Sequence, residues 1–166
     1  MRGFYHKNQP VIAKSAVIFP LVTITGDVTI GERVNIWFSA TLRGDMAKIT
    51  VGDQTNIQDN AVIHTNTGLP TIIGRNVTIG HGAIVHAATI EDDALIGMGA
   101  IILDGAIVLK GAMVGAGCVI PPGKVVPERT LVVGNPMRIV RELSEKELLA
   151  NQDNVNYYLK LSQEYD

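Results

Sequence analysis

The stretch IGMGAIILDGAIVLKGAMVGAGCVI, residues 96–120, places an aliphatic side chain at every sixth position. These positions are Ile96, Ile102, Val108, Val114 and Ile120, and the series continues at Val126 and Val132. A period of six fits neither an amphipathic helix nor an alternating strand. It is typical of a parallel β-helix, in which short strands joined by corners wind into coils.

The same period runs through most of the chain. Earlier members of the series are Ile12, Ile18, Ile24, Ile30, Ile36, Leu42, Val51, Ile57, Ile63, Ile73, Ile79 and Val85. Ile90 lies one residue short of the register, and longer breaks fall at residues 43–50 and 64–72. Three hexads make one triangular coil, so these hexads predict nearly seven coils stacked roughly 4.8 Å apart.

The chain ends in a different pattern. In the segment LSEKELL, residues 143–149, Ser144 can cap a helix and Glu147 can close a capping box. We expect this helix, at about 144–165, to lie along the flank of the solenoid with Leu148, Val155 and Leu159 facing it. The sequence thus predicts a single domain, 1–166, with a β-helix at about 11–137.

Composition excludes several classes of function. The formal net charge is -2 and no basic run occurs, which argues against nucleic-acid binding. Cys118 is the only cysteine, so an internal disulfide and a thiolate-rich zinc site are excluded. No run of 18 apolar residues occurs, and the first ten residues lack the apolar segment of a signal peptide. We therefore expect a soluble, cytoplasmic protein that does not bind membranes.

Three of the four histidines fall in neighbouring coils. His64 and His86 each follow a core position by one residue, three hexads apart, so their side chains should stack on one face. His81 follows a core position by two residues and belongs to a neighbouring corner. A lone histidine near a core is usually structural, but a cluster of three favours a metal site. The fourth, His6, is expected on the surface.

The placement of the histidines also predicts an assembly. Ring nitrogens that share a tetrahedral zinc must lie within roughly 3.5 Å of one another. His64 and His86 can meet that condition within one chain, whereas His81 should point away from them. A neighbouring subunit could supply His81 if three solenoids pack around a threefold axis. The sequence therefore predicts a homotrimer with metal sites between subunits.

Other polar residues fall close to these histidines. Arg43 lies one coil before His64 on the same face, and Asp45 follows close enough to pair with it. A solvated corner is the alternative for Asp45. Asp59 should stack beneath His81, where a carboxylate could orient the imidazole or hold a nearby proton.

The segments RGDMAKITVGDQTNIQDNAVIHT, residues 43–65, and TIGHGAIVH, residues 78–86, resemble the γ-class carbonic anhydrase family of trimeric left-handed β-helices. The resemblance covers nearly the whole chain, and it supplies the left-handed winding. It implies that the metal ligands are His64, His81 and His86. It also implies that Arg43 and Asp45 form an ion pair at the subunit interface.

The resemblance extends to catalytic residues, and this chain departs from the family's active branch. Gln58 would hydrogen-bond the metal-bound water or bicarbonate, with Asp59 beside it. The family's active branch has a long acidic loop with a proton-shuttling glutamate, whereas here the loop is TNTGLP, residues 65–70, without a carboxylate. Short-loop relatives place a tyrosine of the C-terminal helix near the metal. Tyr158 resembles that residue, and the adjacent Tyr157 is the alternative.

The implied function is interconversion of CO₂ and bicarbonate by attack of a metal-bound hydroxide, limited by proton transfer. Zinc is the expected metal, and Fe²⁺ or Co²⁺ could take the same ligands. Two alternatives stay open. One is a hexapeptide-repeat acyltransferase that uses an acyl-CoA and needs no histidine triad, and the other is a non-catalytic metal-binding scaffold subunit.

Overall fold

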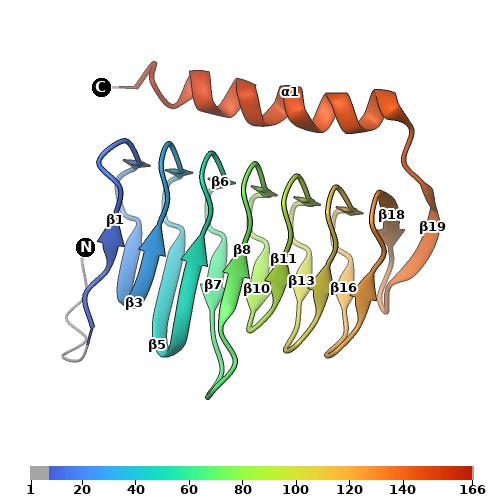
Figure 1. The fold of residues 1–166 in the computed structure, drawn as a ribbon, viewed down its shortest axis with the longest axis horizontal. Coiled ribbons are helices and arrows are strands. Elements are labelled where there is room, and N and C mark those ends of the chain that lie inside the picture. Colours follow the sequence, from blue (N-terminus) through green and yellow to red (C-terminus); the bar gives the residue numbers. More distant parts are fainter. Residues whose placement is uncertain (1–7, 166) are drawn as a thin grey trace.

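The computed structural model describes residues 8–165 and shows a β-solenoid of parallel strands with one helix along its flank (Figure 1). Its coils have three faces, named here in chain order. Face one holds β1 (Val11–Ile12), the second part of β3 (Thr23–Ile30) and of β5 (Thr41–Val51), β8 (Thr71–Ile73), β11 (Thr89–Ile90), β14 (Ile107–Val108) and β17 (Val125–Val126). The predicted fold class is confirmed.

The other two faces follow the same rule. Face two holds β2 (Val17–Ile18), β4 (Asn35–Ile36), β6 (Asn56–Ile57), β9 (Thr78–Ile79), β12 (Leu95–Ile96), β15 (Met113–Val114) and β18 (Thr130–Val133). Face three holds the first part of β3 and β5, β7 (Val62–His64), β10 (Ile84–His86), β13 (Ile101–Ile102) and β16 (Val119–Ile120). Because β3 and β5 run on round a corner, faces one and three join in one sheet.

The aliphatic residue of each hexad points into the solenoid. Ile102 and Val114, for example, are fully buried. Ile90, one residue out of period, still pairs in register with Ile73 and Val108. The missing residue is therefore absorbed at the corner before β11. A slip within the strand would have turned the side chain to the other face.

The corners depend on left-handed backbone. Gly99 and Gly117 turn with φ of 65° and 66°, a region that glycine enters without steric cost. Asn60 and Asn76 take the same conformation with φ of 59° and 54°, and asparagine tolerates it better than most residues. These turns let strands of two or three residues repeat along the axis.

The two breaks in the period form extensions at the lower edge of Figure 1. The first break lies within β5, which continues through it as one strand of 11 residues. The pairing of β5 with β3 shifts in register there, between Gly26 and Val28. The second is the loop at 65–70, where Asn66 and Leu69 form an antiparallel bridge. This loop starts directly after His64 and so lies beside the histidine stack.

Helix α1 (Glu145–Leu161) runs back along the solenoid (Figure 1). Ser144 caps it and Glu147 completes the predicted capping box. Val155 and Leu159 are buried as expected, and Leu148 is half-buried at the edge. The helix ends at Leu161, four residues earlier than expected. Among the described residues, no helix is long and apolar enough to span a membrane.

One element was not expected from the sequence. The parallel coils end with β18, and β19 (Arg138–Glu142) then pairs antiparallel with β18 before the helix begins. The predicted β-helix boundary at 137 therefore falls in the turn between these strands. The extent of the single domain, 1–166, stays a prediction, and residues 1–7 and 166 lie outside the described part.

Candidate metal centre

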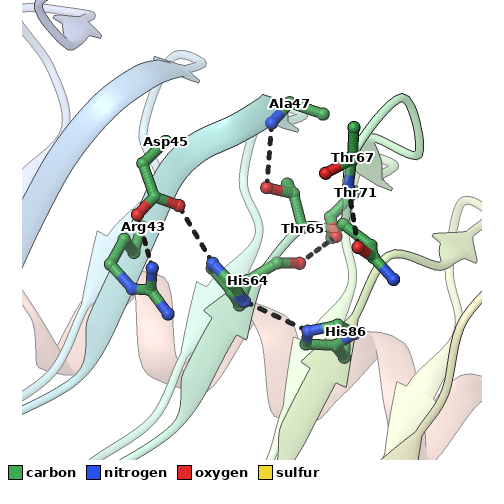
Figure 2. A network of polar contacts seen from close by, with 9 residues as sticks. Arg43, Asp45, Ala47, His64, Thr65, Thr67, Thr71 and His86 are labelled. Carbon is green, nitrogen blue, oxygen red and sulfur yellow. Dashed lines mark hydrogen bonds and ion pairs between the residues drawn. The ribbon is translucent and has the colours of Figure 1, made fainter.

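Two imidazoles face each other across successive coils. His64 ends β7, His86 ends β10, and the two residues are register partners. His64 Nδ1 lies 3.1 Å from His86 Nε2 (Figure 2). Arg43 is the register partner of His64 on the preceding coil. The predicted stack is therefore confirmed, and we call His64 and His86 the imidazole pair.

A carboxylate holds the outer nitrogen of each ring. His64 Nε2 lies 3.0 Å from Asp45 Oδ1, and His86 Nδ1 is hydrogen-bonded to Asp104 Oδ1. An ionised carboxylate only accepts hydrogen bonds, so these outer nitrogens carry the ring protons. In neutral rings the facing nitrogens, His64 Nδ1 and His86 Nε2, then both present lone pairs.

This arrangement fits a metal ion. Two lone pairs 3.1 Å apart cannot hydrogen-bond each other, so the imidazole pair needs a cation, either a proton or a metal. Nitrogen ligands of tetrahedral zinc lie roughly 3.3 Å apart, close to the observed separation. Metal-bound histidines also commonly donate their second ring N–H to a carboxylate, as both do here.

Hydrogen bonds stabilise the two carboxylates in their ionised form. Burial raises the pKa of Asp45, but hydrogen bonds from His64 and Arg43 outweigh it, and the net pKa is lowered. Asn66 first and His86 second lower the pKa of Asp104 by hydrogen bonding. The expected Arg43–Asp45 ion pair forms within one chain. Its place at a subunit interface stays a prediction.

His81 lies elsewhere, at the corner after β9 on face two. Its Nδ1 is 2.8 Å from Asp59 Oδ2, so Asp59 lies beside it as expected. Within the described residues of this single chain, no three histidine, cysteine or acidic side chains are close enough together to hold a metal. Sharing of the site between subunits stays a prediction, and His6 lies outside the described residues.

Gln58 is buried beside His81, and its side-chain amide is held at both ends. Its Nε2 donates to Asn56 Oδ1 at 3.1 Å, and its Oε1 accepts from the His81 backbone N–H at 3.2 Å. One N–H of Gln58 is left for another acceptor. Asn56 was not singled out from the sequence. It is in register with two other polar residues of face two, Asn35 and Thr78, and this run of polar side chains could have indicated a site there.

Of the two adjacent tyrosines, Tyr158 faces the solenoid. Its ring packs edge-on against Trp37, with centroids 5.4 Å apart, whereas Tyr157 is 59% exposed. Burial first, and then the charge of Asp59, raise the pKa of Tyr158. We call His81, Asp59, Gln58 and Tyr158 the His81 corner.

Asp104 and Asn66 were also missed from the sequence. Asn66 Nδ2 donates to Asp104 Oδ2 at 2.7 Å, which links the loop at 65–70 to the imidazole pair. Asp104 lies 18 residues after His86, one coil further along, so the hexad period could have placed it. The loop conformation that brings Asn66 there has no such periodic signal.

Curated relatives carry the names of carbonic anhydrases. A Methanocaldococcus jannaschii protein named “Probable carbonic anhydrase” is 44% identical over 92% of this chain and 96% of its own length. A Geobacillus kaustophilus carbonic anhydrase is 49% identical over 42% of this chain and 38% of its own. “Gamma carbonic anhydrase 2, mitochondrial” of Arabidopsis thaliana is 42% identical over 40% of this chain and 26% of its own length. The match to this chain thus spans well under half of the length of the last two relatives.

Transferases share the repeat and the fold. The family “Bacterial transferase hexapeptide (six repeats)” matches residues 87–122, and “Hexapeptide repeat of succinyl-transferase” matches 70–103. A Bacillus cereus structure provisionally named an acetyltransferase is 42% identical, covers 97% of this chain and 94% of its own, and has a TM-score of 0.95. A Vibrio cholerae acetyltransferase complexed with acetyl coenzyme A is 28% identical, covers 70% of this chain and 71% of its own, and has a TM-score of 0.61.

Proposed function

This chain belongs to the γ-class carbonic anhydrase family, and from that premise we propose that it is a metal-dependent enzyme that interconverts CO₂ and bicarbonate. The observation that carries the proposal is the line Asp45–His64–His86–Asp104. In it, two carboxylates hold the outer ring protons and leave the facing nitrogens free to bind a cation. Zinc fits these ligands, and Fe²⁺ or Co²⁺ would suit the same imidazole set.

The chain's own residues have distinct roles in this proposal. His64 and His86 of one subunit, with His81 of a neighbouring subunit, hold the metal. A zinc ion held by these three imidazoles would lower the pKa of a bound water to about 7 and would thereby supply hydroxide for attack on CO₂. Asp59 orients His81. Gln58 offers its remaining N–H to the oxygen of substrate or product.

Proton release is the step that this chain supports least. The loop at 65–70 contains no carboxylate that could shuttle protons to solvent. Asp59, whose side chain is 31% exposed, lies beside His81 and can take a proton toward solvent. Tyr158 is protonated at neutral pH, as tyrosine ordinarily is, and burial raises its pKa further, so its hydroxyl acts as a hydrogen-bond donor. We expect proton export to limit turnover.

Stopped-flow CO₂ hydration tests the proposal. Zinc-loaded protein should be active, lose activity after chelation and regain it with zinc. At fixed pH and ionic strength, kcat should rise with imidazole buffer concentration because the buffer accepts the exported proton. Full metal content without hydration would contradict the proposal and favour a non-catalytic scaffold.

An acyltransferase is the second candidate, because solved acetyltransferases share the fold and one of them contains acetyl coenzyme A. Such an enzyme needs one histidine as a general base, and it does not require two bare ring nitrogens that face each other. Calorimetric titration with acetyl coenzyme A, paired with metal analysis, separates the two functions. Tight binding of acetyl coenzyme A by protein without metal would favour the acyltransferase.

A further inference from the structure

The loop at 65–70 returns to the candidate metal centre through Asn66. The Asn66 backbone exchanges both of its hydrogen bonds with Leu69, at 3.1 and 2.9 Å. Asn66 Oδ1 accepts from the Thr67 N–H at 2.8 Å, so its Nδ2 points out of the loop. That Nδ2 donates to Asp104 Oδ2 at 2.7 Å. A loop closed by its own hydrogen bonds therefore holds one oxygen of Asp104.

The other oxygen of Asp104 holds His86. Asp104 lies at the corner after β13, one coil beyond His86, and its Oδ1 accepts from His86 Nδ1. The side chains of Asp104 and His86 are 29% and 30% exposed, so water competes only in part for this contact. With both oxygens engaged, the carboxylate of Asp104 cannot swing away from the imidazole ring.

We propose that Asp104 is a positioning residue for His86 and that Asn66 keeps Asp104 in place. The proposal rests on the proposed metal site. By accepting from Nδ1, Asp104 keeps His86 in the tautomer whose Nε2 is bare, and it aims that nitrogen at His64 Nδ1. The loop that lacks a shuttle carboxylate thereby acts on the metal centre, because it sets the affinity for the metal.

The variant Asp104→Asn tests the inference, because it keeps the shape and removes the charge. In competition with a chelator, the zinc dissociation constant should rise 10- to 100-fold, the usual effect of losing a hydrogen-bond partner of a ligand. Ring ¹⁵N spectra of the zinc-free protein should show His86 protonated at Nδ1 in the wild type and less completely in the variant. A merely structural role would leave that tautomer unchanged.

Two further variants keep the test independent of folding. Asp92→Asn is the matched control, because Asp92 also bridges coils, by accepting from the Arg75 N–H at 2.8 Å, but contacts no histidine. Its zinc affinity should equal that of the wild type. Asn66→Ala leaves Asp104 in place and removes one hydrogen bond, so zinc affinity should fall about fivefold.

Two results would overturn the inference, and they differ in meaning. If Asp104→Asn binds zinc as tightly as the wild type and His86 stays protonated at Nδ1, Asp104 does not position the ring, and the proposed function is unaffected. If the wild-type protein binds no zinc, the proposed function fails and the inference fails with it.

Discussion

His64 and His81 face different partners although both are proposed ligands of one ion. His64 belongs to the imidazole pair on face three, whereas His81 lies at the corner after face two, next to Asp59. Each histidine is held by a carboxylate of its own chain, so its ring is oriented before any subunit contact forms. We expect this preorganisation to favour metal binding once the chains assemble.

Tyr158 and Tyr157 provide a matched pair of variants at this scale. Tyr158→Phe should lower kcat for CO₂ hydration about tenfold, the loss expected for one hydrogen bond to a charged group. Tyr157→Phe should have no effect, because that side chain is 59% exposed on the outer side of the helix. Stopped-flow assays at equal zinc content provide the comparison.

The opposite ranking, with Tyr157→Phe inactive and Tyr158→Phe unaffected, would show that the wrong tyrosine has been assigned. Wild-type activity in both variants would show that neither tyrosine of the helix takes part in the reaction. The raised pKa of Tyr158 predicts that its contribution persists through neutral pH, where the hydroxyl keeps its proton.

At the scale of elements, the hexad period assigns each regular residue to a face. It therefore predicted the stacking of His64 on Arg43 and of His86 on His64, together with the approach of Asp59 to His81. Features outside the period could not be predicted. Strand β19 follows the last parallel coil and has no hexad of its own. The loop at 65–70 depends on a contact distant in sequence, which joins Asn66 and Asp104 across 38 residues.

Helix α1 supplies a prediction about pH. Hydrogen bonds from Arg141 first, and then from the Ser144 N–H and hydroxyl, lower the pKa of Glu147 from 4.5 to about 2. A carboxyl whose pKa is lowered by folding stabilises the folded state when the pH is above its pKa in the unfolded chain, and this contribution is lost as the pH falls. Glu147→Gln should therefore weaken the helix at pH 6, and its difference from the wild type should shrink as the pH falls from 4.5 toward 2.

Amide hydrogen exchange of α1 measures this effect without requiring global unfolding. Protection of the first helical turns should fall in Glu147→Gln at pH 6. Ser144→Ala should cost about 1 kcal/mol there, because it removes the helix cap. Unchanged exchange in both variants would mean that packing of Val155 and Leu159, and not the capping box, holds the helix start.

At the scale of the whole molecule, the proposed site is complete only in an assembly. One chain brings together the imidazole pair, and separately the His81 corner, but among its described residues no three ligand-type side chains are arranged to hold a metal ion. A trimer in which each solenoid offers its imidazole pair to a neighbour's His81 would contain three equivalent sites. The central claim is that the metal is shared in this way.

Mixing two inactive variants tests that claim most directly. His64→Ala and His81→Ala chains, unfolded together in equal amounts and refolded, should form sites that pair an intact imidazole pair with an intact His81. With random assembly, about a quarter of the sites should be complete, so about a quarter of wild-type CO₂ hydration and zinc content should return. Each variant refolded alone should stay inactive. No recovery, in trimers shown by mass spectrometry to contain both chains, would contradict a metal site shared between subunits.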